Sequence, residues 1–490
     1  MRITMNRLCI LLFVVCPILA EAQPNTVIQG NAFFYRGKEV AIRHYLDLFT
    51  FKNEPLATQS IEEKGNFKFE LQLDTKGIYL IRIGNVQAHV FIEPGEQYTL
   101  VIPEPQPEDR IGLAKDVFVQ PEIFETGWGL NTKITELEKT INSFVIDFTP
   151  YFLARSIRPH ADSFLVVLDS LFGNQDDAYF NAYFHFRKAE FEITTYHSLT
   201  SVYKKYFMNT PLHYHQLSFA NAFKQLYADH MMPNGLKPYS DSLDHYLVTQ
   251  QFSKALEALM TDPLINRTEE RDLLFAYKIY ELGKLKKLNV KTALALLDSI
   301  EVYTAHPEAR MVAINGQDLL TKLAVGSKIP EIEFADKFGN TYRISEYAGQ
   351  YLYIQFFDRF TPETIRQMSL MKVLKDGYGA DIAMFSISTG ESLKRLKEVP
   401  EDYRFDWIFG KAQHPDRLRD EFDLRALPMY YFVDPELTLV ASPAPPPGER
   451  IERSFAKIWK MNHPSKAVPF KLQPPEVSDD PPPTPNPEKN

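Results

Sequence analysis

Short apolar runs with partly alternating polar positions dominate the chain from residue 27 to residue 103. Turn-forming residues such as Lys64-Gly65-Asn66 and Pro94-Gly95-Glu96 separate these runs. Regular short strands at this spacing are typical of a small β-sandwich, which we place at residues 23–105. The predicted strands cover residues 27–30, 67–73, 79–83, 88–92 and 98–102.

From about residue 120 the apolar period becomes helical. Leu137, Ile141 and Phe144 recur at the spacing of one helix face. At Asn266-Arg267-Thr268-Glu269 the sequence predicts a helix start, in which the Asn266 side chain caps the helix and a glutamate follows three residues later. We find no repeat of fixed period, so residues 120–324 are predicted to be a helical region without the pattern of a helical solenoid.

From about residue 326 strands and helices alternate. The predicted strands cover residues 351–357, 381–387 and 429–433, and the predicted helices 362–376, 390–398 and 416–422. This alternation predicts an α/β domain with helices on both faces of a sheet, placed at residues 325–462. The last 27 residues contain nine prolines, so residues 463–490 are predicted to form a disordered, extended tail. The expected fold class is therefore multidomain, α+β and α/β.

The amino terminus has the pattern of an export signal. Arg2 and Arg7 precede an apolar run over residues 8–19, and Ala20-Glu21-Ala22 fits a cleavage site, so we assign residues 1–22 to a signal peptide. That run is short for a membrane span, and no other stretch approaches 18 apolar residues. We expect an exported protein of the periplasm without a transmembrane segment, with outer-membrane association as an alternative.

Cysteine usage limits the chemistry. Cys9 and Cys16 are the two cysteines, and both fall within the predicted signal. Val15 stands where a lipoprotein signal has a small residue, which argues against lipidation of Cys16. A mature chain without these cysteines forms neither a disulfide nor a thiolate.

Other binding chemistry has little support in the sequence. The net charge of −9 carries no basic cluster of the kind that binds nucleic acid. His213 and His215 are spaced for a strand-borne metal site, but no third ligand is specified, so we interpret them as surface or packing residues. No metal and no cofactor are predicted.

Three connected pieces of the carboxyl-terminal part carry a resemblance. They are the opening Gly326 to Phe334 with the following 344–350 segment, the strand–turn–helix at 351–368, and Leu427-Pro428-Met429 with the apolar run after it. In this order they resemble exported thioredoxin-like proteins of Bacteroidota, which include thiol–disulfide oxidoreductases and relatives of peroxiredoxins. The sandwich resembles a module that precedes such domains. The resemblance implies a three-layer α/β/α domain with a cis Pro428 facing the active site.

The resemblance also identifies what the site has lost. The family's Cys-x-x-Cys aligns with Thr361-Pro362-Glu363-Thr364, so Thr361 and Thr364 stand at the positions of the dithiol. Gln355 stands at the position of the buried acid that relays protons. Threonine, proline and glutamate in this order suit a plain helix start. We therefore predict a degenerate site with no catalytic residue, and expect neither thiol–disulfide exchange nor peroxidase activity.

Several functions stay open. The first is a non-redox binding or scaffold protein of the cell envelope that holds a protein or peptide in the old thioredoxin groove. Its candidate contact residues are Phe360, Trp407, Leu427, Pro428 and Met429. The plain alternative is that these residues only pack. A rival is an enzyme that has recruited Thr361, Glu363 or Asp358, and a third possibility is glycan binding by the sandwich.

Overall fold

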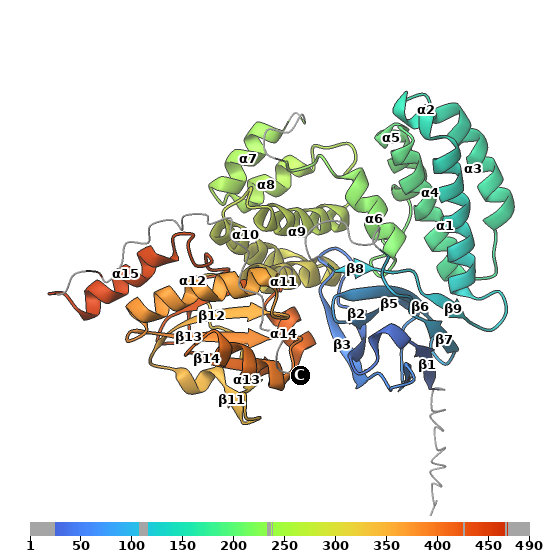
Figure 1. Cartoon of the computed structure of the whole chain (residues 1–490). Coiled ribbons are helices and arrows are strands. Elements are labelled where there is room, and N and C mark those ends of the chain that lie inside the picture. Colours follow the sequence, from blue (N-terminus) through green and yellow to red (C-terminus); the bar gives the residue numbers. More distant parts are fainter. Residues whose placement is uncertain are drawn as a thin grey trace, which may run out of the picture.

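The computed structural model describes residues 25–106, 116–232, 237, 239–424, 427–465 and 468. The predicted signal peptide and most of the predicted proline-rich tail lie outside these residues. Within them the chain forms a sandwich of two sheets, a helical region, and an α/β part (Figure 1). The blue sandwich and the orange α/β part lie side by side beneath the green helices. No helix of the described ranges has the length and apolar character needed to cross a membrane.

The sandwich pairs a sheet of order β4-β1-β7-β9 with a sheet of order β3-β2-β5-β6-β8. Side chains such as Ile28, Ile42, Val90 and Leu100 fill the space between the sheets. Both sheets continue past residue 105, where the sequence places the end of this domain, through β8 and β9. The strands are β1 (Thr26–Asn31), β2 (Glu39–Tyr45), β3 (Asn53–Ser60), β4 (Asn66–Leu71), β5 (Gly77–Ile83), β6 (Val86–Ile92), β7 (Gln97–Val101), β8 (Val117–Phe118) and β9 (Glu122–Phe124).

The helical region runs from α1 to α11. The predicted face of α1 is confirmed, because Leu137, Ile141 and Phe144 are all buried. The helices are α1 (Leu130–Asp147), α2 (Thr149–Leu153), α3 (Arg158–Phe172), α4 (Ala178–Thr194), α5 (Leu199–Val202), α6 (Leu217–Leu226), α7 (Ser240–Val248), α8 (Phe252–Leu259), α9 (Thr268–Lys284), α10 (Val290–Tyr303) and α11 (Pro307–Thr321), with a π-helical turn at Tyr203–Phe207.

The predicted cap of α9 is wrong. Arg267, not Asn266, precedes the first helical residue, and its side chain makes no capping bond. The Asn266 amide instead donates to the Tyr203 hydroxyl at 3.1 Å, and the Asn266 N–H donates to the Glu270 carboxylate at 3.3 Å. The Asn266 side chain therefore binds Tyr203, which is distant in the sequence, and does not cap the helix.

The loop between β2 and β3 joins the sandwich to the helices. Leu48 and Phe49 of this loop are buried in the core of the helical region, and the Phe49 ring meets Phe223 edge-on at 5.5 Å. The Asp47 carboxylate fixes the loop, since it accepts from the Phe49 N–H at 2.8 Å and from the Asn315 amide at 2.7 Å. The sandwich thus contributes residues to the core of the helical region, in addition to the separate cluster between its own two sheets.

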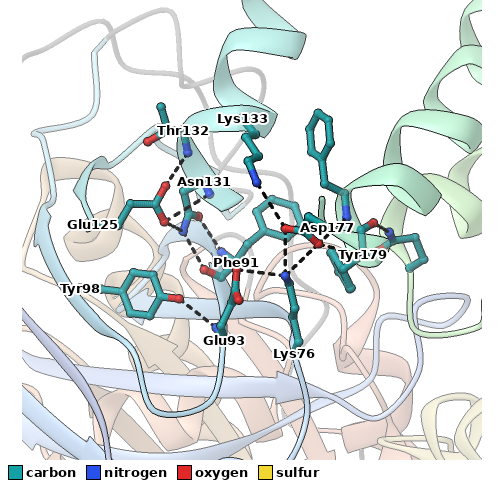
Figure 2. A network of polar contacts seen from close by, with 12 residues as sticks. Lys76, Phe91, Glu93, Tyr98, Glu125, Asn131, Thr132, Lys133, Asp177 and Tyr179 are labelled. Atoms are coloured by element: carbon teal, nitrogen blue, oxygen red, sulfur yellow. Dashed lines mark hydrogen bonds and ion pairs between the residues drawn. The ribbon is translucent and has the colours of Figure 1, made fainter. Parts of the chain in front are cut away.

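A second, polar joint lies between β6 and the helices (Figure 2). The Asn131 amide of α1 pairs with the backbone of Phe91, accepting at 2.8 Å and donating at 2.7 Å. Asp177, the N-cap of α4, contacts Lys76 at 3.0 Å and Lys133 at 3.7 Å. Burial favours a raised pKa for Asp177, but backbone N–H groups and the two lysines outweigh it and hold the pKa below its ordinary value.

The carboxyl-terminal part is built on a seven-stranded sheet of order β11-β10-β14-β13-β12-β15-β16. The central β12 runs parallel to β13 and antiparallel to β15. The strands are β10 (Glu333–Ala335), β11 (Thr341–Arg343), β12 (Tyr351–Phe357), β13 (Ile382–Ser388), β14 (Ile408–Ala412), β15 (Met429–Val433) and β16 (Leu439–Ala441). The helices are α12 (Pro362–Tyr378), α13 (Leu393–Asp402), α14 (Pro415–Glu421) and α15 (Ile451–Asn462).

Helices cover both faces of this sheet, as predicted. Tyr353 packs with residues of α12 and α15, such as Met371 and Phe455. Phe356 points to the other face, where it packs with Leu418 of α14. Neighbouring residues of a strand point to opposite faces, so β12 supplies apolar side chains to both layers. The hydrophobic clusters on this sheet contain no residue of the sandwich or of helices α1–α11 within the described chain.

Candidate functional site

The turn after β12 is a capped helix start. The Thr361 hydroxyl accepts from the Thr364 N–H at 3.1 Å, and the two threonine hydroxyls are 2.9 Å apart. Pro362 opens α12. The Glu363 carboxylate binds Arg366 at 2.7 Å and accepts from Gln367 at 2.9 Å. The predicted helix start is confirmed, and the hydroxyls of Thr361 and Thr364 are used within the helix start itself.

Gln355 lies at the centre of a buried neutral network. Its amide donates to the Tyr430 hydroxyl at 2.8 Å, and its carbonyl accepts from the Ser386 hydroxyl at 2.7 Å. Ser386 in turn accepts from the Trp407 indole N–H at 2.9 Å. Burial raises the pKa of Tyr430, so the phenol stays protonated at neutral pH. This network has a donor and an acceptor for each contact and contains no group that titrates near neutral pH.

The Asp358 side chain is fixed by an ion pair and a hydrogen bond to neighbouring residues. Its carboxylate contacts Arg419 of α14 at 2.9 Å and accepts from the Thr389 hydroxyl at 3.1 Å. Its backbone carbonyl accepts from the Ser388 hydroxyl at 2.7 Å. The loop after β12 is thereby tied to the loop after β13 and to α14. Among the hydrogen bonds of the described residues, none joins Asp358 or Glu363 to Thr361, so these residues do not form a nucleophile–base pair.

Four of the five predicted contact residues pack on two different hydrophobic clusters, and Pro428 lies between two of them in the sequence. Phe360 and Trp407 pack on the cluster around Phe357, whereas Leu427 and Met429 pack on the cluster around Phe356. Phe356 and Phe357 point to opposite faces of the sheet. Phe360 follows the carboxyl end of β12 and Met429 pairs with Phe356 there, whereas Trp407 immediately precedes β14, beside the middle of β12. All five are half-buried, and the Leu427–Pro428 peptide bond is cis, as the resemblance implied.

The two histidines of the sequence analysis lie apart from this site, in the helical region. The His213 ring packs against Phe186 at 5.4 Å, and His215 is exposed. In the described part of the chain, no three His, Cys, Asp or Glu side chains gather in the manner of a metal site.

Sequence reasoning missed the partners that fix this site. Ser386, Tyr430 and Arg419 were not singled out, although each binds Gln355 or Asp358 directly. Their roles depend on strand register: Gln355 lies opposite Ser386 on β13 and opposite Tyr430 on β15. A single sequence does not show which residues of neighbouring strands lie opposite one another, so no local pattern indicates these contacts.

No protein family and no curated protein matches the chain. Several solved structures resemble it in part. The thioredoxin domain of a thiol–disulfide oxidoreductase from Bacteroides vulgatus is 22% identical, with 28% of this chain and 97% of that chain covered and a TM-score of 0.23. A thiol:disulfide interchange protein from Bacteroides sp. is 21% identical, with 29% and 91% covered and a TM-score of 0.25.

The carboxyl-terminal domain of an uncharacterised protein from Bacteroides fragilis is 17% identical, with 28% of this chain and 99% of that chain covered and a TM-score of 0.25. These similarities are weak and confined to little more than a quarter of the chain. The function therefore has to be argued from the residues of the site.

Proposed function

We propose that this protein is a non-redox binding protein of the cell envelope, which holds an extended segment of a protein or peptide partner at the carboxyl end of β12. The observation that supports this most is the capped turn at Thr361–Thr364. Its hydroxyls bond to each other and to the helix, so the position retains its shape but offers no nucleophile. Export to the periplasm is part of the same proposal.

The surface beside the turn suits an extended ligand. Leu427, Pro428 and Met429 are half-buried and lead into β15, whose first residue pairs with Phe356. A half-buried apolar strand end can bind an extended peptide through side-chain contact and backbone hydrogen bonds. Phe360 adds an aromatic side chain on the opposite side of the same strand end. An extended segment that crosses the end of β12 would contact both groups.

Photo-crosslinking tests this proposal. A benzophenone amino acid replaces Phe360, and the purified protein is irradiated with a pool of unstructured peptides. Peptide adducts identified by mass spectrometry should form at position 360. The matched control carries the same group at Phe338, an exposed aromatic of the α/β part. Crosslinks at position 360 should exceed those at position 338 several-fold.

A second substitution makes the result specific to the strand end. Leu427→Asp places a carboxylate among the apolar contacts and should reduce the adducts at position 360 at least threefold, with the circular dichroism spectrum unchanged. Equal adduct yields at positions 360 and 338, or yields insensitive to Leu427→Asp in a folded protein, would refute peptide binding at this site.

A further inference from the structure

A cavity of about 390 Å³ lies where the three parts of the molecule meet. Arg43, Lys52 and Arg82 reach it from the sandwich and its β2–β3 loop. Lys322 reaches it from the end of α11, and Arg419 from α14. A cavity of this size accommodates a small organic molecule, and ligand sites occur preferentially at the junctions of domains.

Two of the arginines converge by strand geometry. Ala41 of β2 lies opposite Arg82 of β5, and Arg43 is two residues along from Ala41. Arg43 and Arg82 therefore project from the same face of the sheet, the face away from the buried Ile42. Both guanidinium groups bind the Asp420 carboxylate of α14, Arg43 at 2.9 Å. Planar guanidinium groups in pairs are well suited to carboxylate and phosphate oxygens.

The charges are unevenly distributed between the inside and the rim. The side chains of Arg43, Arg82 and Arg419 are only 12%, 15% and 20% exposed. Four acids line the cavity: Asp420 is similarly enclosed, whereas Asp116, Asp318 and Asp423 are exposed, the first two by 47% and 58%. Solvent screens the rim acids more strongly than the enclosed cations. The interior of the cavity is therefore net positive.

The pKa of Arg43 reflects the unfavourable burial of this positive charge. Burial lowers the pKa of its guanidinium below the ordinary value, with Arg82 acting in the same direction and Asp420 opposing both. An added anion would relieve that cost, because opposite charge close by favours the protonated form. Lys52 and Lys322 can take part as well, since an ammonium group has three donors, and these lysines donate to Asp318 and to the Asp420 carbonyl respectively.

We propose that this cavity is a binding site for a small organic anion that carries carboxylate or phosphate groups. The anion accepts hydrogen bonds from Arg43, Arg82 and the lysines at the mouth. Because the lining residues come from the sandwich, the helical region and the α/β part, the bound anion also stabilises the packing of all three. Arg419 lines this cavity and also binds Asp358 after β12, but this inference does not depend on peptide binding at the end of β12.

Titration calorimetry and thermal unfolding of the full chain test the site. The probes are inorganic phosphate and succinate, each at constant ionic strength set with sodium chloride. At least one probe should bind saturably with one site per chain and raise the unfolding temperature, whereas chloride alone should not. Binding of phosphate would assign a phosphorylated ligand, and binding of succinate a carboxylate ligand.

The test variant is the double substitution Lys52→Met with Lys322→Met, which leaves the arginine pair and Asp420 intact. It should raise the dissociation constant of the bound probe at least tenfold. The matched control, Lys372→Met with Lys375→Met on α12, removes the same charge away from the cavity and should bind as the unaltered chain does. Lys52→Arg with Lys322→Arg should retain binding, which separates loss of charge from loss of folding.

Two results would overturn the inference. One is that neither phosphate nor succinate binds beyond the effect of chloride. The other is that both methionine pairs weaken binding equally, because the affinity would then reflect net charge rather than this cavity.

Discussion

At the residue scale, Gln355 is the neutral centre of a buried network. At this position the family resemblance implies a carboxyl group, but the side chain present is an amide with a hydrogen-bond partner on each end, Tyr430 and Ser386. A buried neutral amide with satisfied bonds costs little, whereas a buried carboxylate without a cation is costly. The amide at this position thus avoids the cost of a buried charge.

Gln355→Glu should destabilise the α/β part in a pH-dependent way. Burial would raise the pKa of the new carboxyl, so the folded state would hold a proton that the unfolded state releases. Stability should match the unaltered protein best below about pH 4 and fall as pH rises, by about 2–4 kcal/mol at pH 8. Urea unfolding at pH 4.5, 6 and 8 measures this. A pH-independent loss would show that packing, not charge, limits this position.

Glu190 offers the converse experiment, since it is a natural buried acid of α4. The side chain is 9% exposed, and burial raises its pKa to about 8, with Arg187 opposing the shift from 3.5 Å. Below about pH 4 both folded and unfolded states are protonated; between there and pH 8 stability falls as pH rises.

Glu190→Gln should therefore stabilise the protein at high pH. We expect a gain on the order of 2–4 kcal/mol at pH 8 that vanishes toward pH 4, read from urea unfolding at both values. Glu136→Gln on α1, a partly exposed carboxylate paired with Lys139, is the control and should change stability by less than about 0.5 kcal/mol. A gain at pH 4 equal to that at pH 8 would contradict the assigned pKa.

At the scale of elements, burial decides what the sequence can predict. The bounds of β12 and β15 match the predicted ranges, because fully buried strands are continuous apolar runs. Strand β3 escaped prediction, because it lies at a sheet edge, is mostly polar and contains Pro55. The start of α12 was predictable from Thr361 and Pro362, since capping is local chemistry.

The same helix start allows a test of the proposed absence of redox chemistry. Thr361→Cys with Thr364→Cys places two thiols where the hydroxyls are 2.9 Å apart. The thiol introduced at position 361 would sit at a helix N-terminus, which favours the thiolate. The variant should form an internal disulfide on oxidation and reduce insulin in the presence of dithiothreitol faster than the single variants do. The unaltered protein should show no such activity; activity above background would contradict the degenerate site.

At the scale of the molecule, sequence reasoning separated parts that the structure joins. Leu48 and Phe49 belong to a sandwich loop, yet their partners Phe219 and Phe223 lie some 170 residues further along the chain. A local pattern cannot show a contact at that separation. The helix start at Thr361 and Thr364 was predictable, but the partners of Gln355 and Asp358 were not, because they are set by register and by α14.

A shared core predicts how the molecule unfolds. The sandwich and helical region should melt together as one cooperative unit, because Leu48, Phe49 and Phe91 of the sandwich belong to the helical core. The α/β part contributes no residue to that core and should melt as another unit. Phe49→Ala removes a buried ring from the shared core and should cost about 3–5 kcal/mol in the first unit alone.

Differential scanning calorimetry resolves this prediction. The transition of the first unit should shift by several degrees in Phe49→Ala while that of the α/β part stays in place. Phe455→Ala, a buried ring of α15, is the matched control and should shift only the other transition. If either variant moves both transitions together, the polar junction around Asp420 couples the two units as strongly as the shared core couples the sandwich to the helices. If each variant shifts only one transition, the α/β part folds independently of the sandwich and the helical region. The ion pairs at Asp420 then hold these folded parts together without coupling their unfolding.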